Sequence, residues 1–166
     1  MKVLRNKGFD KSKWMQLPRD VLVGHNVLGQ LPQVCGDLSL GDAVLVITGK
    51  RTLEVAGERV ISMLSRKHDT RTFLAEEISP AVIREAEEEA RKVKFIVAVG
   101  GGKNIDTAKV AAFNTDRQFI SVPTAASHDG IASSVASLKG LDRPYSVKAQ
   151  SPIAVIADSK IIRNSP

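Results

Sequence analysis

Six short apolar runs alternate with stretches of helical periodicity along this chain, and the alternation narrows the folds that it can adopt. Most of the runs are rich in β-branched residues and continuously apolar, which is typical of strands buried on both faces. Strands alternating with helices of this length predict βαβ units, and so an α/β fold with a Rossmann-like parallel sheet flanked by helices. The predicted strands are Val21–Val23, Ala43–Ile47, Thr72–Ala75, Phe95–Val99, Phe119–Val122 and Ile153–Ala157.

Two of the helices between these runs have clear sequence signals. Ser79 and Pro80 begin one of them, because Ser is a preferred N-cap and Pro is favoured at the first helical position. Its apolar face is predicted to consist of Val82, Ile83, Ala86, Ala90 and Val93. An earlier helix, which Thr52 is expected to cap, is predicted to have on its apolar face Val55, Val60, Ile61 and Leu64.

Length and composition limit the class of protein. A chain of 166 residues suits one domain. No stretch approaches the roughly 20 continuous apolar residues that span a bilayer, so no membrane insertion is expected. The basic segment 1–13 has no apolar core, which argues against a signal peptide. Cys35 is the only cysteine and cannot form an internal disulfide, which favours a reducing compartment and a cytoplasmic location.

The chain is basic, with a formal net charge of +6 and an isoelectric point of about 9.6. An anionic partner and a solvated basic surface explain this balance equally well. Aromatic residues make up only 4% of the chain, without the interleaving of basic and aromatic residues that stacks bases. Zinc-finger, RNP and basic-zipper patterns are also missing from the sequence, so no nucleic-acid partner is expected.

Three glycines follow the strongest predicted strand and lead directly into a helical pattern. The segment is Gly100-Gly101-Gly102-Lys103-Asn104, and Ile105, Ala108 and Ala112 continue it as one face of a helix. Glycine allows positive φ angles and lets a ligand reach the backbone, while the helix N-terminus presents free N–H groups and the positive end of its dipole. Phosphate binding is therefore predicted here. The segment is neither a G-x-G-x-x-G fingerprint nor a Walker A loop, so a purely structural turn is the alternative.

A second segment, 121–134, is rich in small and hydroxyl-bearing residues and follows the strand Phe119–Val122. The carboxyl ends of parallel strands lie at one edge of a sheet, where the ligands of such folds bind. The segment is therefore expected to wrap a nucleotide, and a polar loop that caps a helix is the alternative. Adjacent residues on a strand or helix point in different directions, so His128 and Asp129 need not act together, and one His with one Asp does not make a zinc site.

Together, the two segments resemble those of the iron-containing alcohol dehydrogenase and dehydroquinate synthase superfamily. The resemblance rests on G-G-G-K-N-I-D-T-A-K at 100–109 and S-V-P-T-A-A-S-H-D at 121–129. Within the superfamily, the chain looks closest to the archaeal sn-glycerol-1-phosphate dehydrogenases. The opening segment 17–26 and the closing segment 156–160 support this resemblance, which covers essentially the whole chain.

The resemblance implies that residues 1–166 are the N-terminal NAD(P)-binding domain of a two-domain enzyme. Such enzymes reduce dihydroxyacetone phosphate to sn-glycerol 1-phosphate with NADH or NADPH and a bound Zn²⁺, for archaeal membrane phospholipids. Asp129 would bind the substrate at its reacting carbon, with no other catalytic residue in this chain. The implied cofactor-binding residues are Gly100, Gly101, Gly102, Lys103, Asn104, Ile105, Asp106, Thr124, Ala125, Ala126, Ser127 and Ser133.

The family's metal ligands, one Asp and two His, resemble a set that lies in a helical second domain, which this chain does not include. Its three histidines are in other contexts, so no metal site is expected here. The reaction needs a Lewis acid to polarise the carbonyl, and we therefore expect no turnover from these 166 residues alone. Measurable reduction of dihydroxyacetone phosphate by them would contradict this. The full-length enzyme is expected to be a homo-oligomer.

Three other functions remain open at this stage. Glycerol dehydrogenase, in the same superfamily, shares the glycine turn, and dehydroquinate synthase is disfavoured because its longer glycine- and lysine-bearing segment is missing. A basic α/β module that binds nucleic acid without catalysis is the alternative from another class. Between the two cofactors, Lys50 and Arg51 after the second strand would tolerate a 2′-phosphate, so NADPH is expected to be accepted at least as well as NADH.

Overall fold

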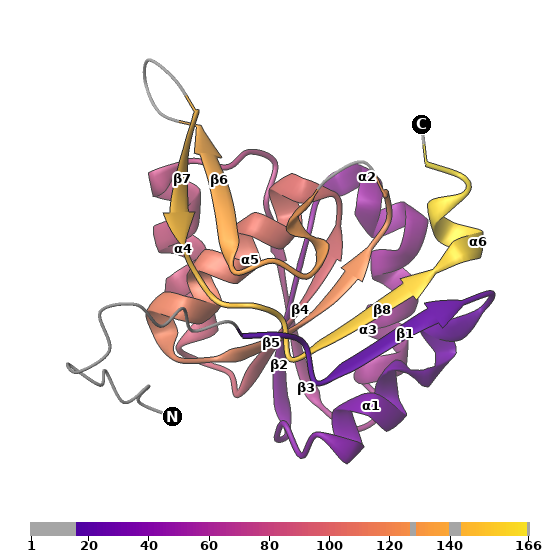
Figure 1. The fold of residues 1–166 in the computed structure, drawn as a ribbon. Coiled ribbons are helices and arrows are strands. Elements are labelled where there is room, and N and C mark those ends of the chain that lie inside the picture. Colours follow the sequence, from indigo (N-terminus) through magenta and orange to yellow (C-terminus); the bar gives the residue numbers. More distant parts are fainter. Residues whose placement is uncertain (1–15, 127–128, 140–143, 166) are drawn as a thin grey trace, which may run out of the picture.

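The computed structural model describes residues 16–126, 129–139 and 144–165, and its main element is a six-stranded sheet (Figure 1). All strand pairs in this sheet are parallel, and the strand order is β1-β8-β5-β4-β2-β3. The strands are β1 (Asp20–Gly24), β2 (Ala43–Thr48), β3 (Asp69–Leu74), β4 (Phe95–Gly100), β5 (Gln118–Pro123) and β8 (Ala154–Asp158). Each overlaps one of the predicted strands, and the predicted α/β class is confirmed.

Burial differs between the central strands and the edge strands. The residues of β4 and β8 are buried throughout, and those of β2 and β5 are buried except at the first position. The edge strands β1 and β3 keep exposed positions, with Val21 and Val23 exposed by 61% and 69%. This explains why the central strands have continuously apolar sequences, whereas the sequence signal of β3 is weak.

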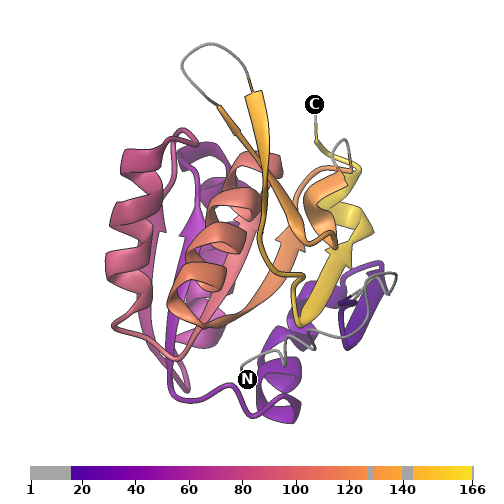
Figure 2. The same cartoon turned by 60° about the vertical axis from the view of Figure 1, so that its left-hand side comes forward.

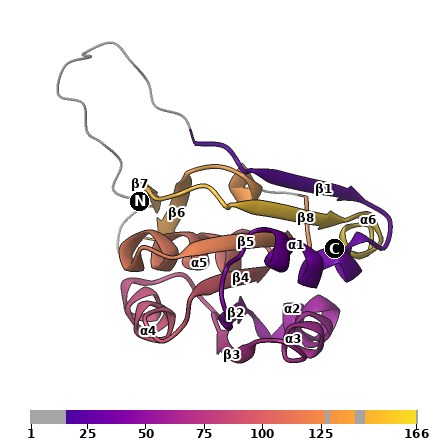
Figure 3. The same cartoon turned by 90° about the horizontal axis from the view of Figure 1, so that it is seen from below.

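Helices cover both faces of the sheet (Figures 1 and 3). On one face, the core contains residues of α1 (Leu31–Asp37) and α3 (Glu58–Leu64). On the other, it contains residues of α4 (Pro80–Ala90) and α5 (Gly102–Thr115). The Ser79 hydroxyl accepts a hydrogen bond from the Val82 N–H at 3.4 Å, which confirms the predicted start of α4. No helix within the described ranges is long and apolar enough to cross a membrane.

The helix after β2 differs from its prediction. It begins one turn early as α2 (Lys50–Thr52) and continues through a π-helical turn, η2 (Leu53–Gly57), into α3. Thr52 therefore lies inside the helix and does not cap it, although its hydroxyl accepts from the Gly49 N–H at 2.9 Å. Val55 is 49% exposed because Ala56, one position on, faces the core together with Val60 and Leu64.

A small antiparallel hairpin, which the sequence did not predict, lies beside α5 (Figure 2). Its strands are β6 (Val135–Lys139) and β7 (Pro144–Lys148). Ala136 and Leu138 of β6 belong to a separate apolar cluster with Val110 of α5. The hairpin therefore extends the segment after β5 across the outer surface of α5.

Candidate functional site

The order in which the chain adds strands to the sheet reverses between the neighbouring parallel strands β2 and β4. From β2 the chain passes to β3 at one edge, whereas from β4 it passes to β5 on the other side. The following helices, α3 and α5, pack on opposite faces. In open α/β sheets, ligands bind outside the carboxyl ends of the strands at such a point. The candidate site therefore lies between the turn Gly49-Lys50 and the turn Gly100-Gly101.

The glycine turn after β4 is shaped for close approach to its backbone. Gly100 has a φ of +151°, and a Cβ there would collide with the side chain of Asn104. Gly101 is different, since a Cβ on it would meet no heavy atom of the described residues within 4 Å. Within the described part of the chain no side chain caps the following helix α5, so its first N–H groups and positive dipole end face this open space. The arrangement suits a phosphate group.

Two side chains of α5 fix the turn against the end of β3. Asn104, only 3% exposed, donates from Nδ2 to the Ala75 carbonyl at 3.0 Å. The Lys103 ammonium donates to the carbonyl of Glu76. Ile105 is fully buried in the core below the turn, as its place on the predicted apolar face requires. The ends of β3 and β4 are thus joined around the candidate site.

The second predicted segment begins beside the glycine turn. The Thr124 N–H donates to the Gly100 carbonyl at 3.0 Å, and Thr124 is 6% exposed. Ala125 and Ala126 follow with increasing exposure. Ser127 and His128 lie outside the described residues, and Asp129 begins the short helix η3 (Asp129–Ile131), where only its backbone is described. The structure therefore brings the two predicted segments together at their starts.

Asp106 and Ser133, both predicted to contact the cofactor, are held in a network below the hairpin. The fully buried Lys109 ammonium donates to Asp106 Oδ1 at 3.1 Å, Ser133 Oγ at 3.2 Å and the Val135 carbonyl at 2.8 Å. Asp106 Oδ2 accepts from the Ser137 N–H at 3.0 Å. Burial lowers the pKa of Lys109, and the Asp106 charge opposes this shift. These contacts anchor the hairpin to α5, and contact with the cofactor stays a prediction for both residues.

Asp158 connects the first and last strands at the same edge of the sheet. Its carboxylate accepts hydrogen bonds from the N–H groups of Asn26 at 3.1 Å, Leu28 at 3.1 Å and Lys160 at 3.0 Å. Burial alone would raise the pKa of Asp158, but these backbone hydrogen bonds outweigh it and the pKa lies below its ordinary value. Asp158 thus holds the opening segment after β1, including the 3-10 helix η1 (Val27–Gln30), against the end of β8.

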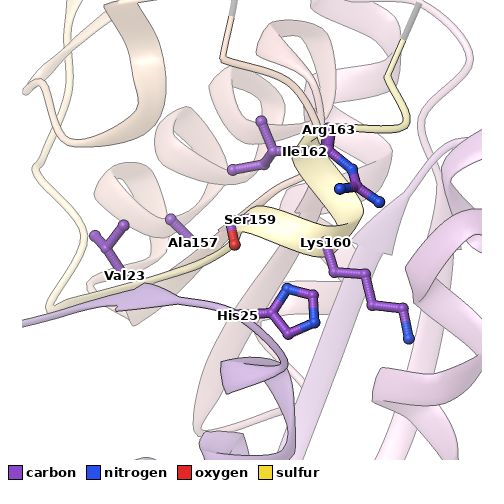
Figure 4. Close-up of a pocket in the computed structure, with 7 residues that line it drawn as sticks. All are labelled: Val23, His25, Ala157, Ser159, Lys160, Ile162 and Arg163. Carbon is purple, nitrogen blue, oxygen red and sulfur yellow. The ribbon is translucent and has the colours of Figure 1, made fainter.

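A hollow of about 340 Å³ lies at the carboxyl ends of β1 and β8, against α6 (Ser159–Ile162) (Figure 4). Basic and apolar side chains share its lining, which consists of Val23, His25, Ala157, Ser159, Lys160, Ile162 and Arg163. Two strands, β8 and β5, separate β1 from β4 in the sheet. The hollow therefore lies, like the glycine turn, at the carboxyl ends of the strands, but it lies beside the outermost strand β1, away from β4.

Cys35 and His68 both have structural surroundings. Burial raises the pKa of the Cys35 thiol to about 12, which suits a core residue of α1. His68 packs edge-on against Phe95, with ring centroids 5.5 Å apart. Across the part of the chain that the structure describes, no three His, Cys, Asp or Glu side chains are grouped so that they could hold a metal ion.

Sequence reasoning missed three of these contacts: those of Glu76, Lys109 and Asp158. Lys109 had a readable signal, because it lies at i+4 from Ile105 on the apolar face of α5. Asp158 also had one, because Asp is a preferred N-cap and here caps α6. Glu76 had none, because its partners come from two other turns.

Comparison with solved structures supports this fold. Glycerol dehydrogenase of Schizosaccharomyces pombe matches with a TM-score of 0.84 at 19% sequence identity, over 94% of this chain and 41% of that chain. A probable glycerol dehydrogenase of Sinorhizobium meliloti matches with a TM-score of 0.80 at 24% identity, over 93% of this chain and 43% of that chain. At these identities the likeness concerns the fold.

Curated relatives are much closer in sequence. Glycerol-1-phosphate dehydrogenase (NAD(P)+) of Methanoculleus marisnigri is 56% identical over 165 residues, which are 99% of this chain and 46% of the relative. The enzyme of the same name from Methanoregula boonei is 54% identical over 166 residues, again 46% of its length. The chain thus spans about half the length of these relatives. The sequence model of the iron-containing alcohol dehydrogenases matches residues 22–166, which include the glycine turn and the Asp158 anchor, and the chain therefore belongs to this family.

Proposed function

We propose that this chain binds NAD or NADP at the glycine turn and forms the dinucleotide-binding part of an enzyme that interconverts dihydroxyacetone phosphate and sn-glycerol 1-phosphate. The observation that carries the proposal is the open space next to Gly101, at the point where the strand order of the sheet reverses. The choice of substrate rests on two relatives that are 54–56% identical and are named glycerol-1-phosphate dehydrogenase.

The residues present fit a dinucleotide. The pyrophosphate would rest on the backbone N–H groups that begin α5, with Gly100, Gly101 and Gly102 giving access and Lys103 adding positive charge. Asn104 and Ile105 would act indirectly, by fixing the turn through Ala75 and the core. Thr124, Ala125 and Ala126 continue from the end of β5, and the nicotinamide side of the cofactor would lie there.

When bound, NAD(P)H would supply the hydride, and this chain would bind and orient the cofactor. The substrate would approach near Asp129 at the start of η3, which follows the end of β5 in the chain. Zn²⁺ is expected on residues beyond these 166, in a second domain, in line with the 46% of the relatives' length that the chain matches. The proposed role of this chain is therefore cofactor positioning.

A calorimetric titration of NADPH and NADH into the protein tests the site when it is repeated with Gly101→Val. The wild type is expected to bind in the micromolar range, and the variant at least about tenfold more weakly. The reason is that the valine side chain fills the space that the pyrophosphate needs, while the turn itself can still form.

Gly36→Val is the matched control, because Gly36 lies in α1 and a Cβ added there would also meet no heavy atom of the described residues within 4 Å. It should leave both affinities unchanged. Wild-type affinity in folded Gly101→Val would contradict the assigned site.

The salt dependence of binding separates a nucleic-acid binder from a dinucleotide pocket. The affinity of a nucleic-acid binder falls steeply with salt because counterions are released.

A further inference from the structure

We propose that Glu76 is the residue that discriminates between NAD and NADP. This inference rests on the proposed function, because it concerns the adenosine ribose of a dinucleotide whose pyrophosphate lies on the glycine turn. Glu76 follows β3 and is exposed at the carboxyl edge of the sheet. It therefore lies where a bound nucleotide can reach it.

Glu76 is fixed from two sides of the candidate site. Its carboxylate Oε1 accepts a hydrogen bond from the backbone N–H of Lys50, after β2, at 2.7 Å. Its main-chain carbonyl accepts from the Lys103 ammonium in the first turn of α5. The carboxylate consequently lies at the end of β2, which is the strand next to β4 and its glycine turn.

This position is the one from which dinucleotide sites of parallel α/β folds bind ribose. In those sites an acidic residue at the end of the strand beside the glycine turn accepts hydrogen bonds from the ribose hydroxyls. Here that strand is β2, and the residues that follow it are Gly49, Lys50 and Arg51. The end of β2 thus offers no carboxylate of its own, and Glu76 brings one there from β3.

The carboxylate has opposite effects on the two cofactors. It can accept hydrogen bonds from the 2′- and 3′-hydroxyls of NAD, whereas it repels the 2′-phosphate of NADP. Lys50 and Arg51 favour the phosphate, as their charges predict from the sequence. The structure shows that the negative charge of Glu76 opposes them, because its Oε1 lies 2.7 Å from the backbone nitrogen of Lys50.

Glu76→Gln is the decisive variant, because glutamine keeps an acceptor for the Lys50 N–H and removes only the charge. The Kd of NADH and of NADPH should be measured by calorimetry on the same protein preparations. The ratio of NADPH affinity to NADH affinity is expected to rise about tenfold in Glu76→Gln. Glu77→Gln, which changes the neighbouring exposed acid, should leave the ratio unchanged.

The outcomes separate this inference from the proposed function. If the wild type binds both cofactors and Glu76→Gln changes the ratio less than twofold, the inference is wrong while the proposed site stands. An equal weakening of both cofactors would also overturn it, because Glu76 would then only shape the turn. If the folded wild type binds neither cofactor, the proposed function itself fails.

Discussion

Lys109→Met is expected to lower the free energy of unfolding by about 3–5 kcal/mol. The substitution keeps most of the side-chain volume but leaves the Asp106 carboxylate, 8% exposed, without its counter-charge. It also removes the donor to Ser133 and to the Val135 carbonyl, which join the hairpin to α5. Chemical denaturation measures the loss, and hydrogen exchange should show faster opening of β6.

The control for this prediction is Lys148→Met, since Lys148 is an exposed lysine of the same hairpin. It should change the stability by no more than about 0.5 kcal/mol. Adding Asp106→Asn to Lys109→Met removes the unpaired charge and should recover part of the loss, because the amide oxygen can still accept from Ser137. A loss below about 1 kcal/mol in the single variant would show that the buried pair is not what holds the hairpin.

Asp158→Ala should cost about 3–5 kcal/mol of unfolding free energy. Three backbone N–H groups lose a charged acceptor, and two of them, in Asn26 and Leu28, belong to the segment after β1. Thermal or denaturant unfolding measures the loss. Asp37→Ala removes the same charge from an exposed position in α1 and is the matched control.

The effect of Asp158 should depend on pH in one direction. Its folded-state pKa lies below the ordinary value of about 3.9, so the unfolded chain takes up a proton first as the pH falls. The stabilisation is therefore complete at neutral pH and is lost as the pH falls through the folded-state pKa. The gap between wild type and Asp158→Ala should be constant above about pH 5 and should narrow at lower pH. A gap that widens on acidification would contradict the assigned role.

The sequence predicted the sheet because its central strands are buried on both faces. Phe95–Val99 and Ile153–Ala157 are apolar at every position, and both are strands within one residue of the predicted bounds. The hairpin was missed because only alternate positions of β6 face the core, and one of these is Ala136, which gives a weak apolar signal.

The glycine turn could also be predicted, since glycine at a strand-to-helix junction has a local cause in backbone geometry. The positive φ of Gly100 agrees with this. The contact of Glu76 with Lys50 could not, because it joins residues 26 positions apart through the parallel register of β3 on β2. The pattern of residue types predicts a parallel sheet, but it does not give the order of the strands and therefore does not say which turns are neighbours.

The pairing of β1 with β8 also sets an order of events during synthesis of the chain. Among the described strands, β1 pairs only with β8, and Asp158, which accepts a hydrogen bond from the Asn26 N–H, lies 132 residues after Asn26. At about 5–20 residues per second, a ribosome needs roughly 7–26 s to make that stretch. The first strand made must therefore wait, unpaired, until nearly all of the sheet has been synthesised, and its docking is expected to be a late step in folding.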